Sequence, residues 1–128
     1  MLSKVQCAFA AAILVIFPVS LDAQSANDIK QLLASWSPAS VEIENGVATV
    51  ILPQRLVTDA MYYPAIAAGF CLGPLLGRQL NDVDELQLLN SFGAQGWVFE
   101  NSEGVCGQIV NEPASRVNAP IAAHSHLY

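Results

Sequence analysis

The feature that most constrains the fold of this chain is a two-residue turn between two β-type runs. Residues 41–44 alternate apolar and acidic side chains, and residues 47–52 form a run rich in β-branched residues. Asn45 and Gly46 stand between the runs, and this pair favours a tight β-hairpin turn because both turn positions need a positive φ. The sequence therefore predicts an antiparallel hairpin, with the apolar residues of the first run toward a core and its glutamates toward solvent.

A helix is expected on each side of this hairpin in the chain. In residues 25–36 the apolar residues recur at steps of three and four, which is typical of a helix with one buried face. A second helix is predicted after Thr58, whose hydroxyl can cap it. Pro64 lies deep in this second segment, so we expect either a kink or a later start, near Tyr63.

Three further segments have the composition of strands, namely residues 85–92, 95–100 and 105–110. Beyond them, prolines, alanines and polar residues predict a flexible tail over residues 113–128. The order helix–hairpin–helix–hairpin predicts a single α+β domain over residues 24–112, with helices packed on one face of a four- to five-stranded antiparallel sheet.

The first 23 residues are typical of a cleaved signal peptide. Lys4 supplies a positive charge, residues 5–21 carry no charge, and Ala23 is a small residue suited to cleavage. An uncleaved membrane anchor is one alternative, because the apolar run just reaches membrane-spanning length. A lipoprotein is another, but Cys7 precedes the apolar run, whereas a lipid-modified cysteine would follow it. The prediction is an exported protein, either periplasmic or secreted.

The net charge of the chain and the scarcity of basic residues argue against two classes of partner. The formal net charge is −6, and removal of residues 1–23 leaves it unchanged because that segment holds one lysine and one aspartate. A basic stripe, the electrostatic requirement for nucleic-acid binding and for attraction to anionic membranes, is missing from the sequence. We expect the partner to be a protein or an envelope component, with no nucleic acid and no membrane.

Two cysteines follow the signal segment, Cys71 and Cys106, and an exported domain with two cysteines most simply forms one disulfide. The chain-entropy model assigns about 3.8 kcal/mol of stability to a loop of this length. Two free buried thiols are the alternative. A catalytic redox pair is disfavoured because the C-x-x-C spacing is missing.

Small residues recur at four-residue spacing, at Ala65, Gly69, Gly73 and Gly77, in a segment without charge. In a soluble domain this spacing predicts a helix whose backbone lies close to a neighbouring element. In a bilayer it would be a helix-association face, so a membrane-inserted protein built on residues 60–77 is the alternative.

Groups suited to catalysis or metal binding are sparse. Asp82, Asp84 and Glu85 form an acidic group that favours a charged loop, although carboxylate catalysis stays an alternative. His124 and His126 could together supply two metal ligands, but structural zinc usually takes four. We therefore predict no catalytic residue, no metal and no cofactor.

Aromatic side chains are the remaining candidates for a binding surface. Trp97, Tyr62 and Tyr63 are the predicted partner-binding residues, while Phe99 is assigned to the core. The sequence as a whole predicts an exported, disulfide-stapled, non-catalytic binding or accessory protein of the cell envelope. A small envelope enzyme that uses carboxylates is the alternative of a different class.

Overall fold

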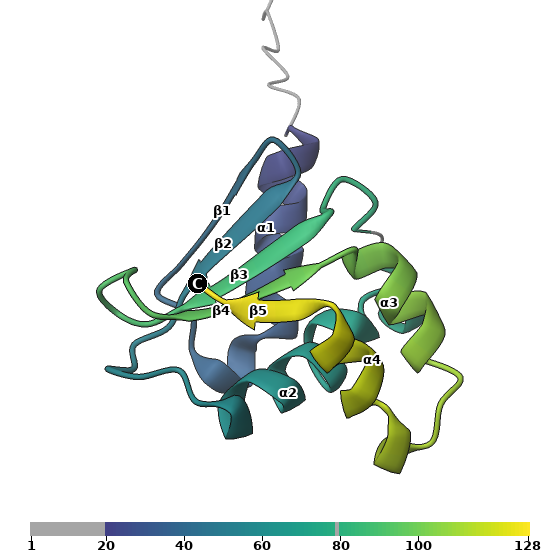
Figure 1. Ribbon diagram of the computed structural model, residues 1–128. Helices are drawn as coiled ribbons and strands as arrows, with labels where there is room; N and C mark the ends of the chain where they lie inside the picture. Colours follow the sequence, from purple (N-terminus) through teal and green to yellow (C-terminus); the bar gives the residue numbers. More distant parts are fainter. Residues whose placement is uncertain (1–19, 79) are drawn as a thin grey trace, which may run out of the picture.

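The computed structural model describes residues 20–78 and 80–128. Within them, five strands form one sheet in the order β1-β2-β3-β4-β5, and the helices pack against one of its faces (Figure 1). The strands are β1 (Ser40–Glu44), β2 (Val47–Ile51), β3 (Glu85–Leu89), β4 (Gly96–Glu100) and β5 (Ser125–Leu127). The helices are α1 (Leu21–Leu32), α2 (Asp59–Ala67), α3 (Ser102–Ile109) and α4 (Asn118–Ala123). The predicted α+β class is confirmed.

The predicted hairpin is present. Strands β1 and β2 pair antiparallel from Ser40 opposite Ile51 to Glu44 opposite Val47. Asn45 and the following glycine take positive φ values, of 52° and 79°, as a tight turn requires. The apolar residues of β1 are half-buried and its glutamates are exposed, which is the predicted division between the two faces.

The sheet is mixed, whereas the sequence predicted an antiparallel one. Strands β2 and β3 run parallel, with Val47 opposite Glu85 and Ile51 opposite Leu89. The chain between them passes through α2 and returns to the level at which β2 began, and such a helical crossover joins parallel strands. The other neighbouring strands are paired antiparallel.

Both predicted helices form, with shifted ends. α1 begins after Ser20, whose hydroxyl accepts a hydrogen bond from the Ala23 N–H at 3.2 Å. α2 follows Thr58, as predicted, but it includes Pro64, so the expected later start is wrong. The proline leaves the carbonyl of Ala60 without its helical donor, and Ala60 is exposed, so water can take that place. The predicted signal peptide lies outside the described residues except for its last four.

Residues 60–77 do not form one helix. α2 ends at Ala67, and two 3₁₀ helices follow, η2 (Phe70–Leu72) and η3 (Pro74–Leu76). A Cβ atom at Gly69 would lie 2.6 Å from the Ala65 carbonyl oxygen and 2.9 Å from Leu33 Cδ2. The small residue is therefore needed where the chain passes the end of α1. In the part of the chain that the structure describes, no helix has the length and apolar character to cross a bilayer.

The segment predicted as a last strand, residues 105–110, is mostly α3. Val105, Cys106 and Ile109 are its buried apolar residues, and their spacing of one and three is helical rather than alternating. The predicted disulfide is confirmed. It joins Cys106 to Cys71 in η2, with a Cα–Cα distance of 4.9 Å.

The predicted flexible tail, residues 113–128, instead carries α4 and the edge strand β5. Ile121 of α4 is fully buried in the core. β5 pairs antiparallel with β4, from Trp97 opposite Leu127 to Phe99 opposite Ser125. Composition suggested a loose tail because most of its side chains are polar or small, and one buried isoleucine together with strand pairing is sufficient to order the segment.

A hydrogen-bonded chain ties this C-terminal segment to α2. The Ser125 hydroxyl lies 2.5 Å from the carbonyl oxygen of Ile121 and 2.5 Å from the Tyr62 hydroxyl. Because the serine proton goes to the carbonyl, the tyrosine is the donor in the second bond. Burial raises the pKa of Tyr62 to about 12. The buried phenol is therefore held in its neutral, donating form.

The raised pKa of Tyr62 makes the free energy of unfolding depend on pH in the alkaline range. In the unfolded chain this tyrosine ionises near pH 10, while in the folded protein it keeps its proton to about pH 12. The stabilising contribution of the neutral, buried phenol is therefore complete below about pH 10 and is lost as the pH rises toward 12. We expect the urea midpoint to fall over this window, and to fall less steeply in Tyr62→Phe, which cannot ionise. Equal slopes for the two proteins would contradict the assignment.

Candidate binding site on a pair of linked loops

The three predicted partner-binding aromatics gather in one cluster. The rings of Tyr62 and Trp97 stack with centroids 5.1 Å apart, and the Tyr63 ring lies edge-on at 5.4 Å from that of Tyr62. Tyr62 is fully buried, so its predicted contact with a partner is wrong. Tyr63 and Trp97 are half-buried and pack against the core, and their contact with a partner stays a prediction. Phe99 is fully buried, as predicted.

The acidic group predicted as a charged loop is divided among three surroundings. Asp82 faces α1, where its carboxylate accepts a hydrogen bond from Ser25. Asp84 is exposed and its carboxylate lies beside Gly46 in the first hairpin turn. Glu85 starts β3 and stands opposite Glu100. The three carboxylates therefore have separate neighbours, and carboxylate catalysis by them stays a prediction of the alternative.

The two histidines lie in the ordered C-terminal segment. His124 follows α4, and its carbonyl accepts the Glu100 N–H at 2.8 Å. His126 is on β5, with its Nδ1 3.7 Å from the carboxylate of Glu100. Across residues 20–78 and 80–128, no group of three or more His, Cys, Asp or Glu side chains is placed to hold a metal ion.

A feature that the sequence did not indicate is the linkage of two loops at one end of the sheet. We call them the loop pair: residues 53–57, which follow β2, and residues 90–95, which join β3 to β4. Asn90 is buried, and its Nδ2 donates to the Arg55 carbonyl at 3.0 Å. Its Oδ1 accepts the backbone N–H groups of residues 94 and 95, at 2.9 and 3.1 Å. One side chain therefore holds both loops.

A second side chain repeats this linkage. Gln95 accepts the Val57 N–H at 2.8 Å through Oε1 and donates to the Val57 carbonyl at 2.9 Å through Nε2. The backbone adds a bond from the Ser91 N–H to the Gln54 carbonyl, at 2.8 Å. These bonds satisfy backbone groups that a loop otherwise leaves to water, and so they fix the shape of the loop pair.

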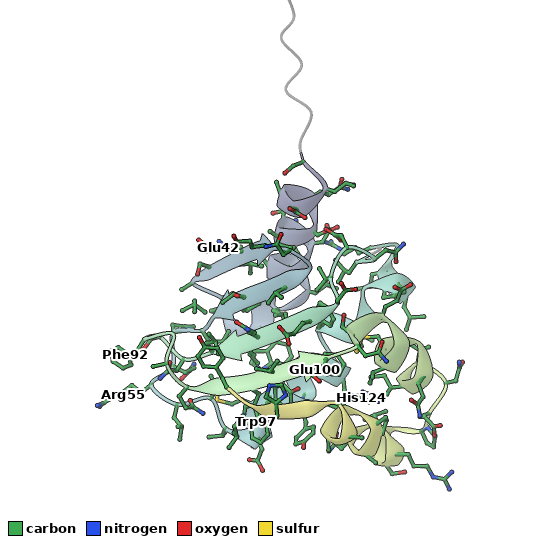
Figure 2. All side chains as sticks on the ribbon, turned by 45° about the horizontal axis from the view of Figure 1, so that its top comes forward. Glu42, Arg55, Phe92, Trp97, Glu100 and His124 are labelled. Atoms are coloured by element: carbon green, nitrogen blue, oxygen red, sulfur yellow. A yellow bond between two sulfur atoms is a disulfide. The ribbon has the colours of Figure 1, made fainter. Side chains whose placement is uncertain are left out.

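The loop pair carries large exposed side chains at its tip. Phe92 is 74% exposed and Leu56 is 57% exposed. Arg55, also exposed, supplies a cation beside them. Figure 2 shows Phe92 and Arg55 projecting from the same end of the molecule. Exposed apolar groups on a rigid, hydrogen-bonded loop are typical of a contact surface rather than of a core.

Sequence reasoning missed the loop pair because residues 85–92 were expected to form one strand, which placed Phe92 within it. The strand ends at Leu89. The signal available in the sequence is the polar residues Asn90 and Gln95 around Phe92-Gly93, which suggests a turn with an aromatic tip. The burial of the asparagine, which makes the turn rigid, depends on a loop distant in the sequence.

Comparison with protein-family models, with curated proteins and with solved structures finds no match for this chain.

Proposed function

We propose that this chain is an exported, non-catalytic binding protein of the cell envelope, processed after Ala23, that contacts its partner through the loop pair. The observation that carries the proposal is the linkage of the two loops by Asn90 and Gln95, with Phe92 exposed at their tip. The charged start and apolar run of the first 23 residues support export. The disulfide fits an oxidising compartment.

Rigidity is the physical reason for assigning contact to these loops. Ordering a flexible side chain or loop on binding costs about 0.5–1.5 kcal/mol for each side chain immobilised. The hydrogen bonds of Asn90 and Gln95 order the loop pair during folding, so this ordering cost does not arise again when the tip binds a partner. A large aromatic at such a tip supplies apolar area with few rotatable bonds, as interface anchors commonly do.

The side chains at the tip define the chemistry of the partner. Phe92 and Leu56 need an apolar socket, and Arg55 needs a carboxylate or another acceptor at the rim of that socket. The proposed partner is therefore a protein with an apolar pocket bordered by acidic groups. The chain's net charge of −6 opposes long-range attraction to an acidic partner, so we expect short-range apolar contact to supply most of the affinity.

The test begins with a photo-reactive amino acid at position 92 in the exported protein, cross-linked in the native envelope and identified by mass spectrometry. With the captured partner purified, Phe92→Ala should weaken binding at least about tenfold, equivalent to about 1.4 kcal/mol. Leu76→Ala is the matched control: Leu76 is 62% exposed but lies in η3, and its variant should bind as the wild type does.

Two results would contradict the proposal. One is equal affinity of Phe92→Ala and the wild type for the captured partner. The other is an enzymatic activity, found by screening substrates, that is lost when the carboxylates of Asp82, Asp84 and Glu85 are replaced and is unaffected by Phe92→Ala.

A further inference from the structure

A cleft of about 330 Å³ lies between η2 and residues 102–107 of α3, separate from the loop pair. We call it the α3 cleft. Its apolar lining includes Phe70, Leu80 and Cys106, which are all buried. Small-molecule sites in proteins have volumes of about 300–1,000 Å³ and a mostly apolar lining with a few polar groups. The α3 cleft therefore has the size and the surface of a site for a compact ligand.

The two walls of the α3 cleft are joined covalently. Phe70 belongs to η2 and Cys106 to α3, and the disulfide between Cys71 and Cys106 links these two elements. The separation of η2 from α3 is therefore set when the disulfide forms, before any ligand binds. A preformed cleft does not have to be ordered on binding, which lowers the free-energy cost of taking up a ligand.

Gly107 keeps the α3 cleft open. It lies inside α3, where glycine is less favourable than alanine. A Cβ atom at Gly107 would meet no atom within 4 Å, so the packing of the described residues does not require a glycine there. Gly104 in the same helix differs, because its Cβ atom would lie 2.9 Å from the Asn101 side chain. Since Gly107 lines the cleft, the missing side chain lets a ligand approach the helix backbone closely.

The polar groups of the α3 cleft mainly accept hydrogen bonds. Ser102 is 1% exposed, and its hydroxyl donates to the Val83 carbonyl at 2.6 Å, which leaves only its lone pairs for a ligand. Glu103 is exposed, and its carboxylate has only acceptor oxygens. The Asn81 amide can either donate or accept. A ligand that satisfies these groups has to supply N–H or O–H donors.

Glu103 also gives the cleft a negative charge. Among the lining residues that the structure describes, it is the one that carries a charge. Within residues 20–78 and 80–128, Glu103 forms no ion pair. Arg78, which is close to Leu80 in the chain, is paired with Asp28 at 3.2 Å. A ligand complementary to the cleft therefore carries a positive charge beside an apolar body.

We propose that the α3 cleft binds a small organic amine that is protonated at neutral pH. Its apolar body packs against Phe70 and Leu80, and its ammonium group contacts the Glu103 carboxylate and the Ser102 hydroxyl. An ammonium group supplies both the donors and the charge that these two polar groups need. This activity does not involve the loop pair, so it goes beyond the partner contact proposed above.

The experiment titrates the purified protein, with its disulfide intact, with the 2-phenylethylammonium ion and follows the backbone amide signals by NMR. Saturable shifts are expected in η2 and in residues 102–107. The neutral probe 2-phenylethanol has the same apolar body with a hydroxyl in place of the ammonium group. It should bind about threefold to fivefold more weakly, the range expected for the loss of one partly exposed ion pair.

Two variants with matched controls locate the site. Gly107→Leu places a side chain in the cleft and should abolish the saturable shifts. Gln108→Leu introduces the same side chain at an exposed neighbouring position outside the lining, and it should bind as the wild type does. Glu103→Gln should weaken binding of the ammonium probe about threefold to fivefold and leave binding of 2-phenylethanol unchanged. Glu42→Gln, at an exposed carboxylate on β1, is the control for net charge.

Three results would overturn the proposal: no saturable shift of the wild-type protein with the ammonium probe, equal affinity for the two probes, or shifts that persist unchanged in Gly107→Leu. The first two use the wild-type protein alone, so they decide the proposal even where a variant fails to fold. None of them bears on the loop pair, which is tested separately by Phe92→Ala.

Discussion

Replacing Gly96 with alanine should lower the free energy of unfolding by about 3–5 kcal/mol, near the upper end of single substitutions. Gly96 starts β4 with a φ of 156°, a conformation that L-amino acids with side chains rarely adopt. A Cβ atom there would lie 2.0 Å from the carbonyl oxygen of Leu88 and 2.9 Å from Leu89 Cα. Both contacts are backbone, so β3 and β4 would have to separate to admit one methyl group.

Gly107→Ala is the matched control, because a Cβ atom at Gly107 in α3 meets nothing within 4 Å. Alanine should there raise the free energy of unfolding by up to about 1 kcal/mol through helix propensity. Urea unfolding of both variants, analysed by linear extrapolation, measures the difference. Near-equal urea midpoints for the two variants would mean that β4 moves away from β3 at a lower free-energy cost than their close approach implies.

Removing the disulfide should be the next largest change. The double variant Cys71→Ser with Cys106→Ser should lose about 3.8 kcal/mol, the closure entropy of a loop with a sequence separation of 35. The bond joins η2 to α3, and both cysteines lie in the buried core, so the folded state also exchanges a buried sulfur pair for two hydroxyls.

Reduction of the wild-type protein provides an independent measurement of the same link. Its urea midpoint under reducing conditions should fall by an amount similar to that of the double variant, and the double variant should not respond to reductant. A midpoint unchanged by both treatments would indicate that packing around η2 and α3 alone sets the stability.

Local patterns in the sequence predicted local structure well. The hairpin was predictable because Asn45-Gly46 fixes both the turn and the register within twelve residues. α3 was not, because the β-branched residues between Val105 and Val110 favoured a strand over the helical spacing of the buried apolar residues. Short apolar runs are ambiguous in this way.

Apart from the disulfide, features that depend on distant partners were not predictable. The parallel pairing of β2 with β3 follows from the path of α2 between them. The order of the C-terminal segment follows from Ile121 in the core and from the bond between Ser125 and Tyr62. The polarity of a side chain can be read from the sequence, whereas the order of a segment depends on the residues that its side chains contact in the fold.

The predicted partner-binding residues lie outside the loop pair. Tyr62, Tyr63 and Trp97 form one cluster, in which the ring of Tyr62 lies inside the core. The loop pair could not be anticipated, because its rigidity comes from Asn90 bonding a carbonyl 35 positions earlier in the chain. Side-chain-to-backbone bonds of this range leave no periodic signal.

The position of β5 at the edge of the sheet has a consequence for the order of folding. β5 follows every other strand in the chain, so during synthesis the edge of β4 stays unpaired until β5 has emerged. Until then the Tyr62 hydroxyl has no acceptor at Ser125. The nascent chain can form the first hairpin early, but the edge of β4 stays unpaired until the last residues are made. During that time chaperones can bind this edge, or it can pair with a strand of a neighbouring molecule.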